Sequence, residues 1–434
     1  MHYLAQLLFI VLLSVATYFF VRNLTRIRRN IFLGRKTNWN DRPAERWKNM
    51  IRVALGQSKM VVRPVAGIMH IIIYAGFVLI NIEVLEILID GIFGTHRALS
   101  VFGGLYDAAI GFFELLALGV MVACFVFLSR RYLIKLKRFA NPDLKGFANQ
   151  DAATILIIEL VLMSALLIMN AADQTLQNLG SAHYKQAGMF PVSSLVAPLF
   201  ANLSEGTLIF TERFSWWIHI IGIFLFMNYL PFSKHFHIIM AFPNTYYTRL
   251  EPKGQLSNPV NVTNEVKLML DPNANIETGD DLPKSFGAKD IFDLTRKNLM
   301  DAYTCTECGR CTSVCPANIT GKLLSPRKIM MSTRDRLEEV GRNLDTKGAE
   351  YSDEKDLHSY ITPEELWACT SCNACVEACP VDINPLEIII EMRRYQVMEK
   401  SAAPAELNLM MTNLENNGAP WQYSASDRMK WVNE

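Results

Sequence analysis

The sequence predicts an all-α protein in which a five-helix transmembrane bundle is followed by a cytoplasmic α-helical ferredoxin domain with two 4Fe–4S clusters. Three observations support this fold class. Long apolar segments are confined to the N-terminal half of the 434-residue chain, and positive charge is concentrated in alternate loops between them. A four-cysteine pattern of the kind that binds iron–sulfur clusters occurs twice in the C-terminal half.

The composition limits the classes of protein to be considered. Half of the residues are hydrophobic and unevenly distributed, which argues against a soluble single-domain enzyme. The formal net charge of +1 gives no indication of nucleic-acid binding. We divide the chain into a membrane domain (residues 1–242), an extended linker (243–290), a helical dicluster ferredoxin domain (291–400) and a partner-docking tail (401–434).

Five apolar segments are long enough to cross a bilayer, which takes about 20 residues. They cover roughly residues 3–21, 62–89, 105–128, 153–172 and 210–236. The first segment is followed by basic residues, the opposite of the charge order of a cleaved signal peptide, so we expect an uncleaved helix. We expect Trp216 and Trp217 to form part of an interfacial aromatic belt.

The loops between the spans differ in charge. Basic residues are concentrated between the first and second spans and between the third and fourth, whereas the other two loops contain only Arg97 and Lys185. The positive-inside rule therefore predicts a multi-pass protein of the cytoplasmic (inner) membrane, with its N-terminus outside and the ferredoxin domain in the cytoplasm. We interpret the basic residues as topology signals and lipid-headgroup contacts rather than as a docking surface.

The cysteine pattern is C-x2-C-x2-C-x3-C-P, and its second copy begins 64 residues after the first, from Cys305 to Cys369. In two-cluster ferredoxins with this spacing, the fourth cysteine of each run binds the other cluster. We therefore assign cluster 1 to Cys305, Cys308, Cys311 and Cys379, and cluster 2 to Cys369, Cys372, Cys375 and Cys315. The alternatives are structural zinc sites or disulfides, but zinc ligands usually come as two separated pairs.

The cluster cysteines also indicate a compartment, because reduced, metal-loaded cysteines are typical of the cytoplasm. The ninth cysteine, Cys124, lies alone in an apolar segment and is interpreted as a buried hydrophobic residue. Outside the motifs, a charged helix is expected over 326–344, another helix is expected over 385–399, and Thr362 is expected to begin a third. Trp421 and Trp431 suggest a docking segment, or else a tail folded back on its own domain.

Histidines in or near the spans are candidate haem ligands, because a b-type haem takes one imidazole on each face. His219 and His237 are 18 residues apart, about 27 Å on an unbroken helix, and cannot share one haem. Depth in the bilayer favours His70 paired with His237, and His235 is a near neighbour. His219 is a candidate for a second haem. The alternative is that these histidines only form hydrogen bonds within the bundle.

Four acidic residues fall inside the predicted spans: Glu83, Glu86, Glu114 and Glu159. An ionised carboxylate near mid-bilayer costs about 2.5–3.5 kcal/mol on insertion scales, so each residue requires an explanation. Glu83 and Glu86 share one helix face. The four residues are candidates for proton transfer to a quinone, and a purely structural role is an equal alternative. The pattern assigns no catalytic residue.

The membrane half resembles the gamma subunit of respiratory nitrate reductase, a five-helix di-haem quinol oxidase. The resemblance rests on Trp217, His219 and residues 231–237 and 70–76. The C-terminal half resembles the helical ferredoxin subunits of heterodisulfide reductases and anaerobic glycerol-3-phosphate dehydrogenase. That match covers residues 305–316, 321–326, 369–380 and 413–421.

The resemblance implies a haem on the cytoplasmic side between His70 and His237. The ligand that would pair with His219 for an outer haem is replaced by Ile80, unless His96 or His183 substitutes. In relatives with fused domains, a cysteine-rich module of the CCG type follows the ferredoxin domain. Here we expect a separate partner, either a CCG-type catalytic subunit, a flavoprotein or an electron-transfer flavoprotein.

Together these features suggest the membrane subunit of a quinone-linked oxidoreductase, active in a complex. It would pass electrons between a soluble cytoplasmic partner and menaquinone or ubiquinone through two 4Fe–4S clusters and one b-type haem. The alternative hypothesis is a non-catalytic membrane anchor whose ferredoxin part relays electrons to a neighbouring subunit. Membrane lipid and quinone are the other expected partners.

Overall fold

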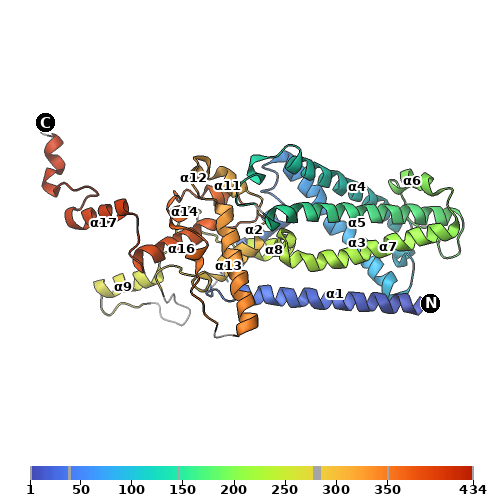
Figure 1. Ribbon diagram of the computed structural model, residues 1–434, viewed down its shortest axis with the longest axis horizontal. Coiled ribbons are helices and arrows are strands. Elements are labelled where there is room, and N and C mark those ends of the chain that lie inside the picture. Colours follow the sequence, from blue (N-terminus) through green and yellow to red (C-terminus); the bar gives the residue numbers. More distant parts are fainter. Residues whose placement is uncertain (1, 38–40, 145, 277–284, 349–350, 433–434) are drawn as a thin grey trace.

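A computed structural model describes residues 2–37, 41–144, 146–276, 285–348 and 351–432. It confirms the predicted all-α fold class, with five long apolar helices followed by a helical cysteine-rich domain. The molecule is elongated, with the helix bundle at one end and the ferredoxin domain at the other (Figure 1). Within the described residues, the one β pairing is an isolated bridge between Arg35 and Thr295.

Five helices are long and apolar enough to span a membrane. They are α1 (His2–Ile31), α3 (Pro64–Phe93), α4 (Gly104–Tyr132), α5 (Phe147–Asn178) and α7 (Glu205–Tyr229). Helices α1, α4 and α5 extend beyond the predicted spans at both ends, whereas α3 begins two residues later than predicted and α7 ends early. The boundaries follow local chemistry: α3 begins at Pro64, which needs no amide donor, and ends before Gly94 at a φ of 70°.

The fifth helix ends at Tyr229, whereas the sequence suggested a span reaching residue 236. Pro231 lacks a backbone N–H, and the chain turns through two short 3-10 segments, Leu230–Phe232 and Lys234–Phe236. A new helix, α8 (His237–Tyr246), then begins. His219 and His237 therefore lie on different helices.

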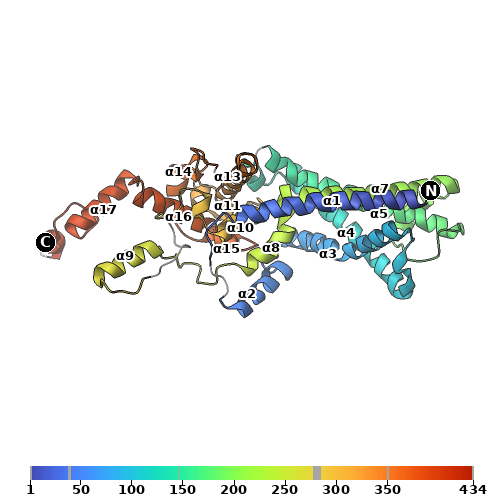
Figure 2. The same ribbon diagram turned by 90° about the horizontal axis from the view of Figure 1, so that it is seen from below.

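Helix α1 belongs to both parts of the molecule. Its 30 residues correspond to about 45 Å, more than the roughly 30 Å of a hydrocarbon core. The excess passes into the ferredoxin domain, where Ile27 and Ile31 are buried in one core with Leu299 and Val340 (Figure 2). The bundle and the ferredoxin domain are thus joined by a shared core as well as by the linker.

Basic residues of the first loop also hold the two parts together, in addition to any role in topology. Arg29 forms an ion pair with Asp345. Arg46 is only 1% exposed and attaches the loop to the end of α8 and the linker, donating to the carbonyl oxygens of Tyr246 and Thr248 at 3.2 and 2.8 Å. Our interpretation of this loop as topology signals and lipid contacts therefore missed its structural role, because the partners are distant in sequence.

The ferredoxin domain consists of short helices around the cysteine loops. They are α10 (Arg296–Thr304), α11 (Arg310–Val314), α12 (Pro316–Ile319), α13 (Pro326–Lys347), α14 (Pro363–Trp367), α15 (Ala374–Ala378) and α16 (Pro385–Met398). Caps set several of the starts. The Ser325 side chain accepts from the Lys328 amide, and Thr362 forms a capping box with Glu365.

The linker and the tail contain more helix than the sequence suggested. Region 243–290, expected to be extended, includes the end of α8 and a separate helix, α9 (Val260–Leu270); residues 277–284 lie outside the described part. Helix α2 (Pro43–Met50) leads into a π-helical turn, Ile51–Leu55. The tail forms α17 (Ala405–Asn417) and a 3-10 segment, Ala425–Val432, which project from the ferredoxin domain (Figure 1).

Candidate functional site

The two cysteine motifs adopt the same backbone conformation. Glu307 and Ser371, at equivalent positions, both have left-handed φ angles, of 54° and 57°. Two residues later, Gly309 and Asn373 have φ of 70° and 60°. A five-residue helix follows each turn, α11 in the first motif and α15 in the second. The sequence repeat is therefore a structural repeat, with a tight left-handed loop presenting three cysteines.

The eight cysteines fall around two cavities. One is lined by Cys305, Cys308, Cys311 and Cys379, together with Cys375, which lines both cavities. The other is lined by Cys315, Cys369, Cys372 and Cys375. The fourth cysteine of each motif thus lies with the first three of the other motif, the arrangement expected for two clusters with crossed ligands.

Backbone N–H groups point at the cysteine sulfurs and suit a negatively charged cluster. The Ser371 amide donates to Cys369 Sγ at 3.4 Å, and the Ile383 amide donates to Cys379 Sγ at 3.3 Å. Burial raises the pKa of the Cys305 and Cys375 thiols to about 12. Thiolates in these cavities therefore require a cation among them, which the iron of a cluster supplies.

The geometry does not favour the zinc alternative. In the described part of the chain, no three cysteine, histidine or acidic side chains form a group suited to one metal ion. Four sulfurs around an open cavity instead match a larger inorganic core. The residues present therefore fit two 4Fe–4S clusters.

Arginines surround the cluster cavities, and the sequence analysis did not select them. Arg310 connects cluster cavity 1 to the loop before α3, donating to the carbonyl oxygen of Lys59 at 2.9 Å. Arg393 donates to the Leu366 carbonyl oxygen at 2.6 Å beside the second cavity. The position of Arg310 within the first motif could have identified it as a neighbour of a cluster. Nothing in the sequence near Arg393 indicates its contact, because that contact depends on tertiary packing.

His70 and His237 lie side by side. Their ring centroids are 6.2 Å apart. The Nδ1 atom of His70 is buried and has no hydrogen-bond partner among the described residues, whereas Nδ1 of His237 donates to the Lys234 carbonyl oxygen at 3.0 Å. Burial lowers the pKa of His237, so its ring is neutral, the form that binds metals. His235 packs against it with centroids 5.5 Å apart.

His219 has a different environment. It is 1% exposed, and its Nδ1 donates to the carbonyl oxygen of Leu162 at 2.9 Å. Ile80 is buried in the bundle core and offers no ligand. His96 and His183 pack on each other at 5.3 Å between centroids and line a separate cavity at the far end of the bundle. Among the described residues, no second imidazole packs against His219 to form a pair for another haem.

The four acidic residues differ in their contacts. Glu114 accepts from the amides of Val192 and Ser193 at 2.9 and 3.0 Å, and so holds the loop before α6 (Ser193–Val196). Glu86 accepts from the Leu99 amide and the Tyr106 hydroxyl.

The other two carboxyls have no hydrogen-bond partner among the described residues. Glu83 is buried and borders the cavity that also contains His96 and His183. Glu159, on α5, is half-buried and lies outside that cavity.

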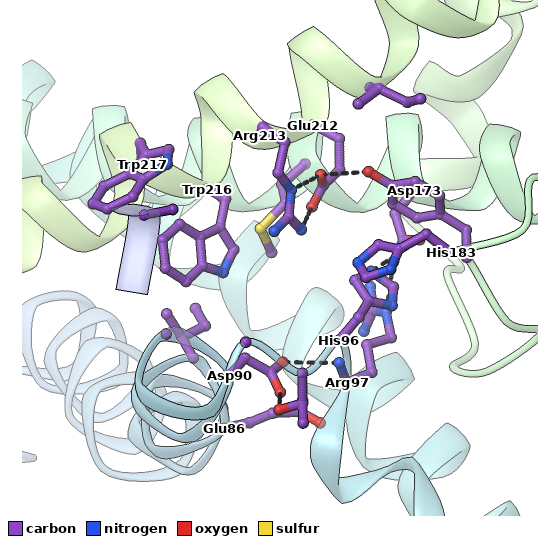
Figure 3. Close-up of a pocket in the computed structure, with 18 of the residues that line it drawn as sticks. Glu86, Asp90, His96, Arg97, Asp173, His183, Glu212, Arg213, Trp216 and Trp217 are labelled. Atoms are coloured by element: carbon purple, nitrogen blue, oxygen red, sulfur yellow. Dashed lines mark hydrogen bonds and ion pairs between the residues drawn. The ribbon is translucent and has the colours of Figure 1, made fainter. Parts of the chain in front are cut away.

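Trp216 and Trp217, expected in an interfacial belt, instead face the interior of the bundle. Trp216 is only 8% exposed, and both rings pack around Phe9 of α1. Figure 3 shows them on the wall of the far-end cavity, opposite Glu86 and Asp90. This cavity has a volume of about 460 Å³ and lies among α1, α3, α5 and α7.

Comparison with known proteins supports a domain with two 4Fe–4S clusters. A family described as "4Fe-4S dicluster domain" matches residues 304–383. The "Probable iron-sulfur-binding oxidoreductase FadF" of Bacillus subtilis is 29% identical over 458 residues, covering 99% of this chain and 61% of the relative. The "EtfAB:quinone oxidoreductase" of Syntrophomonas wolfei is 28% identical over 431 residues, covering 91% of this chain and 55% of the relative.

A third relative is a "Probable membrane-anchored ferredoxin" of Chromohalobacter salexigens, 30% identical over 170 residues, covering 35% of this chain and 25% of the relative. No solved structure matches the chain. The chain spans between half and two thirds of the length of the first two relatives. It is a multi-pass, membrane-anchored protein with two 4Fe–4S clusters in a dicluster ferredoxin domain, related to FadF and EtfAB:quinone oxidoreductase.

Proposed function

We propose that the protein is the electron-transfer subunit of a quinone-linked oxidoreductase, passing electrons between a soluble cytoplasmic flavoprotein and the membrane quinone pool. One observation carries the proposal: Lys234 connects the histidine pair to cluster 1. Its carbonyl oxygen holds His237 at 3.0 Å, and its Nζ binds Glu307, between Cys305 and Cys308, at 2.8 Å. A redox centre at the histidines would therefore adjoin the first cluster.

A b-type haem between His70 and His237 is the second part of the proposal. With a metal–nitrogen distance of about 2 Å on each side, two imidazole rings that share one iron have centroids roughly 6 Å apart. The observed 6.2 Å agrees with this separation. The hydrogen bond from His237 Nδ1 leaves Nε2 available as the ligand atom. One haem is proposed here, and none at His219.

The clusters supply one-electron transfer between the cytoplasmic surface and the bundle. Cluster cavity 2 includes the exposed Cys372, and it is the natural entry point for a soluble partner. We propose an electron-transfer flavoprotein as that partner because the name of the Syntrophomonas relative contains EtfAB and quinone. A CCG-type subunit remains the rival partner. The charge of the loops supports the cytoplasmic orientation.

The test uses the purified complex in detergent. Stopped-flow reduction by reduced electron-transfer flavoprotein should bleach the cluster absorbance and reduce a b-type haem, and added menaquinone or ubiquinone analogue should reoxidise both. If His70→Ala abolishes haem content and quinone turnover while the non-haem iron content is unchanged, the proposal stands. If turnover survives without haem, or if no quinone reoxidises the protein, the chain is instead an anchor with a ferredoxin relay.

A further inference from the structure

We propose that the cavity at the far end of the bundle binds the head group of the quinone, with Glu83 and His96 as the groups that form hydrogen bonds with it. This inference rests on the proposed function, because it locates the quinone substrate. Ala5, Gln6 and Phe9, near the start of α1, line the cavity, and Figure 1 shows that this end of α1 lies away from the ferredoxin domain. Its volume of about 460 Å³ lies within the range of small-molecule sites.

One side of the cavity is aromatic and apolar. Phe9 of α1 contacts Trp216 and Trp217 of α7, with ring centroids 5.6 and 6.3 Å apart. Ile87 and Met169 add to the same lining. Such a wall accommodates a flat, neutral ring, and α1 is the least buried of the five spans, so the apolar side borders the lipid from which a quinone arrives.

The other side is polar, and most of its groups already have partners. Arg97 donates to Asp173 at 2.5 Å and to Tyr106 at 2.9 Å. Asp90 accepts from the backbone amides of Arg97 and Ala98. These contacts fix the orientation of most polar groups in the wall. Glu83 differs, because it borders the cavity, is 4% exposed and has no hydrogen-bond partner among the described residues. A carboxyl in this position can form a hydrogen bond with a group that enters the cavity.

His96 is the second group with unused bonding capacity. Its Nε2 lies 3.6 Å from Asp173 Oδ1, beyond a good hydrogen bond, and its ring packs against His183 and Tyr184. Burial lowers the pKa of His96 to about 4, so its ring is neutral and can offer one N–H donor and one nitrogen acceptor to a bound head group. Glu83 on α3 and His96 after α3 therefore provide a carboxyl and a neutral imidazole for hydrogen bonds on one side of an aromatic cavity.

Charge distinguishes a quinone from a haem in this place. The lining contains five carboxyls, Glu83, Glu86, Asp90, Asp173 and Glu212, but only two arginines, Arg97 and Arg213. Both arginines are paired, with Asp173 and Glu212 respectively. An anionic haem would bring its propionates into an excess of acidic groups. A neutral quinone meets no such repulsion, and the acidic groups supply its protons.

Reduction of a quinone balances with the electrons that the proposed function delivers. A quinone takes two electrons, delivered one at a time from the clusters, and two protons, one at each carbonyl oxygen, to give a quinol with two hydroxyls. Quinol oxidation is the reverse. His70 and Glu83 are 13 residues apart on α3, about 20 Å along the helix axis. The proposed haem at His70, which would donate the electrons, and the quinone head group near Glu83 would therefore lie in the same bundle.

The test measures binding to the oxidised protein, so that it does not depend on electron transfer. Purified full-length protein is titrated with decylubiquinone and with menadione, and tryptophan fluorescence is followed because Trp216 and Trp217 line the cavity. We expect saturable quenching, and at least a tenfold weaker Kd in both Glu83→Gln and His96→Gln. Glu159→Gln, a span carboxyl outside the cavity, should retain the Kd of the unmodified protein.

A second measurement uses the unmodified protein, so its result does not depend on whether the variants fold. An azidoquinone is photolysed on the unmodified protein, and the labelled peptides should contain residues of α3 from Glu83 onward or Trp216 and Trp217. A label confined to the His70 peptide, or a Kd unchanged by Glu83→Gln and weakened by Glu159→Gln, would overturn the inference. Tight cavity binding without turnover would instead contradict the proposed function and leave the cavity assignment intact.

Discussion

The imidazole rings of His70 and His237 lie 6.2 Å apart between centroids, although they come from two helices that are distant in the sequence. His70 is in the second turn of α3, and His237 begins α8, directly after the break at Pro231. The break matters because it turns His237 out of the axis of α7 and toward α3. This pair determines whether the bundle contains a redox centre of its own.

Replacing His70 by alanine should eliminate the proposed b-type haem, because one of the two histidines that would hold it is lost. The measurement is the pyridine haemochrome and the reduced-minus-oxidised spectrum of purified protein. His235→Ala is the matched control: its ring is 5.5 Å from that of His237 but is not paired with His70, so haem content should stay near that of the unmodified protein. Haem that persists in His70→Ala would contradict the pairing.

Cys379→Ser should remove the same cluster as Cys305→Ser, although Cys379 belongs to the second motif. The reason is that both sulfurs line cavity 1. Non-haem iron should fall from roughly eight to roughly four atoms per chain in each variant. Electron paramagnetic resonance of the reduced protein should lose the same signal in both.

Cys315→Ser provides the complementary case, since it lines cavity 2 and should eliminate the other signal. If Cys379→Ser and Cys369→Ser lost one signal together, each motif would bind its own cluster, and the crossed arrangement would be wrong.

Glu307→Gln should weaken the junction between cluster 1 and the bundle. Glu307 is 5% exposed and binds both Lys234 and Arg334, and removing one member of a buried ion pair typically costs about 3–5 kcal/mol. Burial acts to raise the pKa of Glu307, but attraction to Arg334 and Lys234 outweighs it, and the net pKa is lowered.

The lowered pKa determines the sign of the pH dependence. The stabilisation is present above the carboxyl's unfolded pKa, about 4.3, and is lost only as pH falls through the lower folded value. The difference in unfolding free energy between Glu307→Gln and the unmodified protein should therefore be constant from pH 8 to about 5.5, as measured by denaturant unfolding in detergent. The exposed Glu415→Gln is the control and should have little effect. A difference that shrinks between pH 8 and 6 would exclude the ion-pair explanation.

Gly341→Ala should loosen the seam between α1 and α13. A Cβ at residue 341 would lie 2.5 Å from the side-chain amide of Asn30, which is 3% exposed and donates to the Tyr303 hydroxyl at 2.9 Å. Overpacking of this kind costs about 1–3 kcal/mol, so the thermal midpoint of cluster bleaching should fall.

Gly206→Ala is the matched control for this change, since nothing lies within 4 Å of its added Cβ and alanine favours a helix. Combining Gly341→Ala with Asn30→Ala should cost less than the two single effects together, because the clash is relieved. Strict additivity would place the destabilisation elsewhere.

Much of the site was accessible from residue spacing, but its supporting contacts were not. The eight cysteines and the pairing of His70 with His237 follow from motif spacing and bilayer depth. Lys234 and Glu307 escaped notice because a lysine and a glutamate 73 residues apart leave no local pattern. Trp216 and Trp217 were assigned to an interface because hydropathy alone does not show which helix face meets a neighbour.

The amino-acid sequence by itself determined the chemistry that each segment can support: soft sulfur ligands at iron–sulfur spacing, and apolar runs long enough for lipid. Those properties depend on neighbouring residues and on length. Only the tertiary structure decided which carboxyl stays unpaired, which arginines bind carbonyl oxygens, and how far α1 enters the ferredoxin core. Packing between distant segments sets those contacts, because a side chain's burial and partners depend on neighbours that the chain brings together only when it folds.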